Sequence, residues 1–309
     1  MFVTSAALTA ALTLTVASSG AQDTRPPQTD QTVPVSRGTR LQVNNFAGEV
    51  IVRTWEKDTL RVVARHRSGT RVSVRPEPSA VAVSSSTSSG PPGSVDYEIS
   101  APAWMPVRVE GTYAFISVEG SQADIAAENV RGDIVIKGGT GTVTARSIEG
   151  EVLVEGARGK ITVNGVNEGV RVIDATGDIL AETTNGDIAL SRIESASVEA
   201  TTVNGDITFE GRIPERGRYR FASHNGDIIL MLEETANATI TARSYQGDFR
   251  SALPVKGPPA GEVRGGRRVA YTLGSGRADI EVETFSGDIR IRRPGETAGK
   301  DKSKADKKD

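Results

Sequence analysis

Cysteine is absent from this chain of 309 residues, and histidine occurs only at His66 and His224. Without cysteine there are no disulfide bonds, no thiol catalysis, no zinc sites built on cysteine and no lipid attachment through an N-terminal cysteine. Two histidines are too few for a histidine-rich metal site within one chain. These absences exclude several common classes of enzyme and metalloprotein.

A charge excess of either sign is also missing, because 37 Lys and Arg residues stand against 39 Asp and Glu residues. A nucleic-acid-binding protein normally carries a basic stripe, so we predict no nucleic-acid partner. Aromatic residues make up only 5% of the chain, whereas Gly, Thr, Val and Ile are plentiful. This mixture is typical of short strands and tight turns, and no long stretch has the 3.6-residue apolar period of a helix.

The N-terminus holds the one long apolar run. Residues 2–16 are apolar or small, and Ser19-Gly20-Ala21 offers small residues for cleavage after Ala21. We interpret residues 1–21 as a signal peptide, although no Lys or Arg precedes the apolar run; a disordered apolar leader is the alternative. No later segment reaches the ~20 apolar residues that span a bilayer. We therefore expect an exported protein, periplasmic or extracellular, with no stable membrane insertion after cleavage, and a polar linker over residues 22–34.

A short cassette recurs through the rest of the chain. It reads Asn204-Gly205-Asp206-Ile207 and returns around Gly186 and Gly226, with shorter Gly-Asp versions elsewhere. Glycines at 132, 141, 150, 159, 169, 177 and 186 are 8 to 10 residues apart, and those at 205, 226, 247 and 287 follow at steps of 19, 21, 21 and 40. Such a period indicates a solenoid with coils of 18 to 21 residues. A three-sided coil of 27 residues fits the early steps equally well, but the later steps favour two sides.

The residues after each cassette assign the two faces of a strand. Ile207 and Phe209 alternate with Thr208 and Glu210, and the same period of two recurs in the sister repeats. Because a one-residue slip would expose the whole apolar row, this alternation fixes which side is buried. The fold class predicted is all-β, a parallel β-solenoid of the β-helix or β-roll type.

The predicted solenoid spans residues 111–293. An N-terminal β section over residues 35–110 is expected to cap its first coil, since an open end would present unpaired strand edges. Residues 254–268 interrupt the pattern, and we interpret them as an exposed excursion that accounts for the 40-residue step. Residues 294–309 are charged and almost free of apolar residues, which predicts a disordered tail.

The cassette residues are assigned structural roles. Glycine is expected to supply a positive φ at the corner, asparagine to tolerate the left-handed region, and aspartate to accept backbone N–H groups in the turn. The recurring aspartates could instead form a calcium-binding ladder along one edge. The residues concerned are Asp133, Asp178, Asp187, Asp206, Asp227, Asp248 and Asp288. Calcium-binding nonapeptide rolls need two glycines and an Asp in each unit, and that form does not occur in this chain.

Other candidate sites are weaker. His224 stands two residues before a cassette glycine, where sister repeats have Thr184, Val203 or Tyr245, and this variability indicates a corner position. Arg264, Arg267 and Arg268 could meet an anionic glycan or phosphate, but a solvated loop is the simpler interpretation. Gly274-Ser275-Gly276 is expected to be a turn, and Asn237-Ala238-Thr239 is a glycosylation sequon by pattern only. We predict no catalytic, cofactor-binding or metal-binding residue, no cofactor, and no identified ligand-binding residue.

The opening segment (residues 41–50 with Trp55), the Asn-Gly-Asp-Ile repeats and the closing Phe285-Ser286-Gly287-Asp288-Ile289 together resemble a known family. It is the bacterial β-strand-repeat "putative adhesin" family, a domain of unknown function, and the resemblance covers roughly residues 35 to 293. It implies an exported, solenoid-like envelope protein. The family supplies no catalytic residues.

The leading functional hypothesis is a non-enzymatic cell-envelope protein, an adhesin-like binding or scaffold module that contacts an envelope glycan or protein through outward Thr, Arg and Glu rows. A polysaccharide-active lyase or hydrolase is the alternative, since acidic residues are many, but no pair of carboxylates is singled out by the sequence. A structural or signalling accessory of the envelope is a third possibility. The oligomeric state is not indicated by the sequence.

Overall fold

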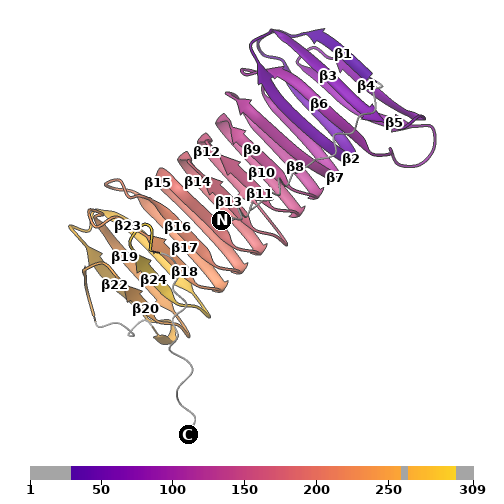
Figure 1. Cartoon of the computed structure of the whole chain (residues 1–309). Helices are drawn as coiled ribbons and strands as arrows, with labels where there is room; N and C mark the ends of the chain where they lie inside the picture. The colour runs from indigo at the N-terminus through magenta and orange to yellow at the C-terminus, as the bar shows by residue number, and fades with distance from the viewer. Residues whose placement is uncertain (1–28, 259–263, 297–309) are drawn as a thin grey trace, which may run out of the picture.

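The computed structural model describes residues 29–258 and 264–296, which form an elongated stack of strands with β1 near one end and β22 near the other (Figure 1). Within these ranges there are 24 strands, one short 3₁₀ helix, η1 (Arg264–Gly266), and no α-helix. No helix in the described part is long and apolar enough to cross a membrane. The predicted signal peptide, residues 1–21, and residues 297–309 of the predicted tail lie outside the described residues.

Each coil contributes one strand to each of two faces, which we call face 1 and face 2. Face 1 contains β2 (Arg40–Trp55), β4 (Thr70–Pro76), β5 (Ala80–Thr87), β7 (Val107–Ser121), β8 (Ile125–Arg131), β10 (Thr140–Glu149), β12 (Arg158–Asn164), β14 (Thr176–Asn185), β15 (Ile188–Asn204), β17 (Arg218–Asn225), β19 (Ala238–Ser244), β22 (Arg268–Leu273) and β23 (Ala278–Thr284), with β21 (Val255–Lys256) beside β22. Face 2 contains β1 (Thr29–Pro34), β3 (Thr59–His66), β6 (Val95–Pro102), β9 (Ile134–Gly138), β11 (Val152–Glu155), β13 (Val170–Ile173), β16 (Ile207–Arg212), β18 (Ile228–Met231), β20 (Phe249–Ser251) and β24 (Ile289–Arg292). The long strands β2, β7 and β15 bend through a corner and belong to both faces.

Strand register establishes the length of the coil. Ile125 pairs with Val143, and Val143 with Ile161, so equivalent residues are 18 positions apart in parallel strands. Farther along, Ile188 pairs with Ile207 at 19 positions and Ile207 with Ile228 at 21. With two strands in each turn, the predicted two-sided coil is confirmed and the three-sided alternative is wrong.

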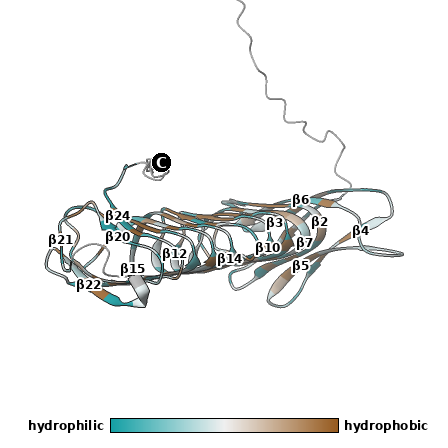
Figure 2. Ribbon diagram, turned by 90° about the horizontal axis from the view of Figure 1, so that it is seen from below, coloured by the Kyte–Doolittle hydropathy of each residue, from teal (hydrophilic) through white to brown (hydrophobic). Residues whose placement is uncertain are grey.

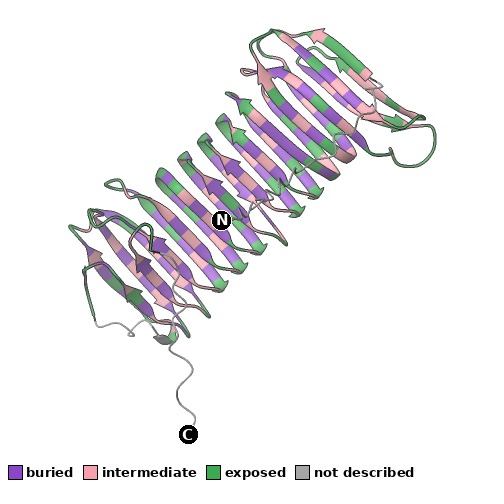
Figure 3. Ribbon diagram, in the orientation of Figure 1, coloured by how far each residue is buried: buried purple, intermediate pink, exposed green. Residues whose placement is uncertain are grey.

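Alternating side chains build the core between the two faces, and Figure 3 shows buried and exposed residues in stripes across the stack. Ile207 and Phe209 are fully buried, whereas Thr208 and Glu210 lie on the outer surface, as predicted. In Figure 2, seen from below, the stack runs across the picture and its coils appear as flattened loops. The inward rows of the two faces form one buried core between them. A single coil has too little buried area to fold alone, and stacking supplies the rest.

The N-terminal section corrects two sequence-based boundaries. The solenoid begins with β2, which pairs in parallel with β7 over most of its length, so the expected boundary at 110/111 falls inside the continuous strand β7. Thr29–Pro34, expected to belong to the linker, forms β1 and pairs antiparallel with β3. An edge strand needs no apolar face, and Arg61 also binds Asp30 through two hydrogen bonds of 2.9 and 2.7 Å. Because residues 29–34 are mostly polar, the sequence pattern did not predict this strand.

The expected cap is present at this end. Strands β5 and β6 extend the two faces beside β2, and the antiparallel strands β4 and β3 close them. The first coil is thus covered by the β4–β5 hairpin on face 1 and by the antiparallel pair β3 and β6 on face 2.

At the other end the strands are not stacked in chain order. The closing strands β23 and β24 lie between the coil of β17 and β18 and the coil of β19 and β20. The sequence predicted that the 40-residue step reflects an excursion from one coil, and this prediction is wrong. Instead, β21 and β22 follow β20, β22 pairs antiparallel with β19, and the chain then turns back into the stack. Residues 259–263 of the predicted excursion lie outside the described residues. The final strands are enclosed on both sides.

Candidate functional site

The cassette lies at the corner where each coil passes from face 1 to face 2, which we call the cassette corner. The expected positive φ occurs at Gly132 (116°) and Gly205 (159°), but Gly226 and its equivalents Gly186, Gly247 and Gly287 lie outside the left-handed region and need another explanation. A Cβ atom added at Gly226 would lie 1.9 Å from the carbonyl oxygen of Gly205 in the preceding coil. Glycine is needed because successive coils approach each other closely at this corner.

Three side-chain rows connect the coils beside this glycine. Inside the corner, hydroxyl groups donate to the glycine carbonyl of the neighbouring coil, as in Thr202 to Gly186 at 3.0 Å and Ser223 to Gly205 at 2.9 Å. Outside it, the side-chain amide of Asn204 donates to that of Asn185 at 2.7 Å. No cassette asparagine has a positive φ, so asparagine links coils and does not shape the turn.

The aspartates form the third row, here called the Asp row. The backbone N–H of Asp206 donates to Asp187 Oδ1 at 2.8 Å, and that of Asp227 donates to Asp206 Oδ1 at 2.7 Å. Asp288 and Asp248 continue the row. The predicted structural role is confirmed, but the donors belong to the next coil and not to the turn of the aspartate itself.

Charge along the Asp row is uneven. Burial raises the pKa of Asp206, and the carboxylates of Asp227 and Asp187 act in the same direction. At Asp288 burial acts to raise the pKa, but the N–H of Asp248 and the guanidinium of Arg290 outweigh it and hold the pKa below its usual range. Within the described residues, no group of three or more His, Asp or Glu side chains is placed to hold a metal ion.

One of the seven predicted aspartates does not belong to this row. Asp178 follows Gly177 at the start of β14 and pairs in register with Lys160, at the opposite corner of the coil. Because Gly-Asp turns recur about every nine residues, which is half a coil, they occur at both corners. Aspartates with the same motif therefore do not all lie along the same edge of the solenoid.

Exposed apolar side chains follow one line along the cassette corner. In every coil the residue two positions before the glycine, or its register equivalent, points outward. This corner row consists of Phe46, Thr112, Val130, Ile148, Val166, Thr184, Val203, His224, Phe285 and Tyr245. Five of its members are exposed large hydrophobic residues, with fractions of 43% for Val130, 38% for Ile148, 43% for Val203, 39% for Phe285 and 36% for Tyr245.

The aromatic end of the corner row is a stack. The rings of His224 and Phe285 are 4.8 Å apart with an interplanar angle of 14°, and Phe285 and Tyr245 are 5.1 Å apart. The guanidinium of Arg243 lies 4.9 Å from the Tyr245 ring, and a Cβ at Gly266 would collide with that ring. Ring faces are therefore covered by neighbours, and ring edges remain accessible. His224 occupies the corner position that the sequence predicted.

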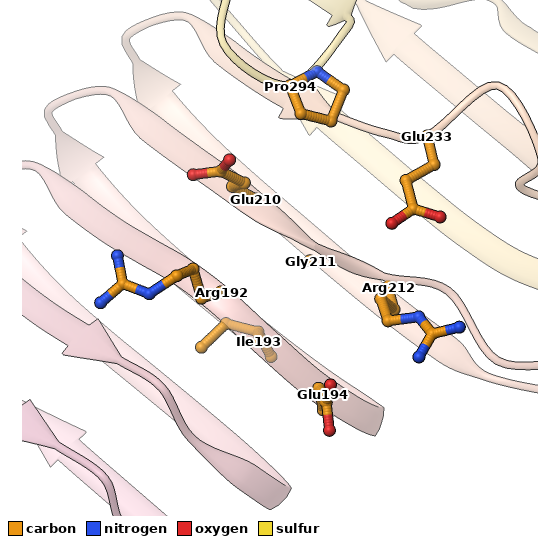
Figure 4. Close-up of a pocket in the computed structure, with 8 residues that line it drawn as sticks. All are labelled: Arg192, Ile193, Glu194, Glu210, Gly211, Arg212, Glu233 and Pro294. Carbon is orange, nitrogen blue, oxygen red and sulfur yellow. The ribbon is translucent and has the colours of Figure 1, made fainter.

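Carboxylates gather at the opposite, return corner. Glu194, Glu210 and Glu233 line a pocket of about 220 Å³ together with two arginines. Figure 4 shows these three side chains on different coils, spread along the outer surface and not directed at one point. One of the arginines, Arg192, donates two hydrogen bonds of 2.6 Å to Asp174 in the preceding coil. The three glutamates make this pocket a candidate location for the alternative of a polysaccharide-active enzyme.

The remaining candidates from the sequence have structural partners. Arg268 forms an ion pair of 3.0 Å with Glu281, so its guanidinium already has a partner, whereas the side chain of Arg264 lies outside the described part of the chain. Gly274-Ser275-Gly276 is the turn between β22 and β23, as predicted, and the backbone N–H of Ser275 donates to Asn237 Oδ1 at 2.9 Å.

Sequence reasoning identified the cassette but not the corner row. A signal for it was available, because the position two before the cassette glycine is apolar in most coils although its neighbours are polar. Alternation alone assigns that position to the solvent, where a single apolar residue is ordinary and only its recurrence from coil to coil is informative. Recognising the row required the register of all the coils.

Comparison with known proteins agrees with this fold. The chain belongs to the Toastrack DUF4097 family, which matches residues 9–292, and the resemblance inferred from the sequence is thereby confirmed. No curated protein matches the chain.

Three solved structures match the chain over most of its length. A "putative cell adhesion protein" from Clostridium sporogenes is 12% identical, with 86% of this chain and 99% of that chain covered and a TM-score of 0.24. A "putative adhesin" from Bacteroides fragilis is 12% identical, with coverage of 85% and 96% and a TM-score of 0.39. One from Parabacteroides distasonis is 6% identical, with coverage of 85% and 96% and a TM-score of 0.43. At these values the similarity does not bear on what this chain binds.

Proposed function

We propose that this chain is an exported, non-enzymatic protein of the cell envelope that binds or scaffolds an envelope component through the outer surface of its solenoid. The corner row carries this proposal. Contiguous apolar side chains on the surface of a soluble protein mark interaction sites, whereas scattered ones need no explanation. Here five exposed large hydrophobic residues share one register position.

The corner row is not needed for the core. Its side chains point away from the space between the faces, and Thr112 and Thr184 hold the same position in two coils. A polar residue is thus compatible with the corner. An apolar residue in most of the other coils therefore favours contact with a partner over a role in folding.

The test replaces exposed members of the row that do not take part in the aromatic stack. We expect the triple substitution Val130→Ser, Ile148→Ser and Val203→Ser to abolish cosedimentation of the purified protein with isolated cell envelopes, and any signal on a glycan array. Its urea midpoint should stay close to that of the wild type, because all three residues are substantially exposed. A matched control replaces Val135 and Leu153, half-buried residues on the outer side of face 2, by serine.

Two outcomes would oppose the proposal. Equal envelope binding by the triple variant and the control would exclude the corner row as the contact. No binding of the wild type to envelopes or glycans would remove the support for a binding function as a whole.

A polysaccharide-active enzyme is the second candidate, and the carboxylates of the return-corner pocket favour it. Glycoside hydrolysis needs an acid and a second carboxylate on either side of one bond. If the chain is a hydrolase, incubation with envelope polysaccharides will release reducing ends, and Glu194→Gln and Glu210→Gln will stop the release. We expect no release from the wild type.

A further inference from the structure

A groove opens on the outer surface of face 1 near its N-terminal end. Its volume is about 630 Å³, and it crosses β2, β7, β8 and β10. Ala126 lies between the larger side chains of Arg108 and Thr144 in the neighbouring strands. Because the side chain of Ala126 is small, the surface is hollow at this position. Figure 2 shows β4 and β5 projecting beyond the stack beside β2, and Ser79, just before β5, lines that end of the groove.

Two arginines, one aspartate and three hydroxyl side chains line the groove. Arg40 is exposed and forms no ion pair with any described residue. Arg108 is held between Glu110 at 2.8 Å and Glu128 at 3.2 Å. The hydroxyl groups of Thr142 and Thr144 complete the far end.

The acid that lines the groove is already engaged. Asp124 Oδ1 accepts the backbone N–H of Thr142 at 2.7 Å. Of the two guanidinium groups that line the groove, that of Arg40 is the one without a carboxylate partner among the described residues, which suits a carboxylate ligand.

Strand spacing indicates what kind of molecule carries that carboxylate. Neighbouring strands are about 4.8 Å apart, so the four strands present polar groups over about 14 Å along the solenoid axis. The spacing of about 4.8 Å between neighbouring strands is close to the length of one pyranose ring in a glycan chain. Hydroxyl, amide and guanidinium groups at such intervals match the hydroxyl groups of successive sugars.

We propose that this groove binds an acidic oligosaccharide of about three residues, with a sugar carboxylate at Arg40. The proposal rests on the binding role proposed above but uses a different surface from the corner row. Gln42 and the two threonines contact sugar hydroxyls, and Ala126 provides the floor on which a ring lies.

The experiment is isothermal titration of the full chain with trigalacturonic acid, and with its methyl ester as the uncharged probe of the same shape. We expect the acid to bind at least tenfold more tightly than the ester, and Arg40→Ala to weaken binding of the acid by about tenfold or more, because a charge-assisted hydrogen bond is lost. Ala126→Phe, which fills the hollow without changing charge, should abolish binding of both probes.

A matched control is available in the same face. Arg218 is exposed at the start of β17, in the register position that Arg40 occupies in β2, and it lies outside the groove. Arg218→Ala removes the same charge and should leave affinity unchanged. Equal effects of the two arginine substitutions, equal affinity for acid and ester, or no binding of the acid at millimolar concentration would each overturn the proposal.

Two further arms identify the ligand class and separate the two proposals. Triaspartate should not compete with the acidic sugar, and competition that depends on Arg40 would show a site for carboxylate peptides, against the proposal. Cleavage of trigalacturonic acid during the titration would refute the non-enzymatic function whatever the groove binds. Loss of envelope binding in the corner-row variant together with no sugar binding would refute the groove alone.

Discussion

Substitution of Gly226 by alanine tests whether the close approach of coils, and not backbone conformation, explains the cassette glycine. The new Cβ would lie 1.9 Å from the carbonyl oxygen and 2.5 Å from the carbonyl carbon of Gly205. Since Cβ atoms essentially never come within 3.0 Å of another atom, the neighbouring backbone would have to retreat by about 1 Å.

The expected cost follows from the contacts at this corner. The N–H of Gly205 donates to the carbonyl of Asn225 at 2.9 Å, and the Ser223 hydroxyl donates to the carbonyl of Gly205 at 2.9 Å. A displacement of about 1 Å takes both beyond hydrogen-bonding distance, at about 0.5–1.5 kcal/mol each. Forced displacement in a packed region adds about 1–3 kcal/mol. We therefore expect the free energy of unfolding to fall by about 3 kcal/mol.

The assay is urea unfolding followed by far-ultraviolet circular dichroism, with midpoints compared because a repeat protein can unfold in stages. Gly93→Ala is the control, since its Cβ would lie 3.7 Å from the nearest atom, Thr70 Oγ1, and its φ is ordinary. Gly226→Asn separates the two explanations, because asparagine tolerates the left-handed region but not the collision. The reasoning is wrong if Gly226→Asn is as stable as the wild type. It is also wrong if Gly226→Ala and Gly93→Ala have the same urea midpoint.

Three other predictions concern the same corner. Ser223→Ala should lower the free energy of unfolding by about 1 kcal/mol, and Ser223→Thr should restore it, because threonine occupies this position in sister coils; equal urea midpoints for the two would contradict the inner hydroxyl row. The folded-state pKa of Asp206 is raised, so its charged form destabilises the fold at neutral pH, and this penalty disappears as the pH falls through that pKa. Asp206→Asn should accordingly raise the urea midpoint at pH 7, with a gain that shrinks in acid, and no gain at pH 7 would refute the argument. EDTA should change the melting temperature by no more than about 1 °C, because the Asp row already accepts backbone N–H groups, and a loss of several degrees would reveal a structural cation.

Local patterning predicted most of the repeat unit. The alternation around Ile207 and Phe209 placed the buried side correctly, since a period of two leaves one choice once the apolar row is known. Steps of 19 and 21 residues favoured the two-sided coil that the register shows. The role of Gly226 was assigned incorrectly, because a collision with another coil cannot be read from neighbours in the sequence.

Long-range order was harder to predict. Nothing around Gly287 indicates that its coil is inserted between those of Gly226 and Gly247, since all three carry the same motif. β1 was taken for a linker, because an edge strand has no apolar row to reveal it. The groove at Arg40 depends on residues from four strands that lie far apart in the chain.

The sequence by itself determined that this protein is an all-β solenoid with two-sided coils, because strand alternation and glycine spacing are local properties. Only the tertiary structure decided the order of the coils at the C-terminal end, the separation of Asp178 from the Asp row, and the alignment of apolar residues into the corner row. These depend on which strands lie side by side. Cassettes that share the Gly-Asp motif can pair in several orders, and their pairing is fixed only when the whole stack closes its ends.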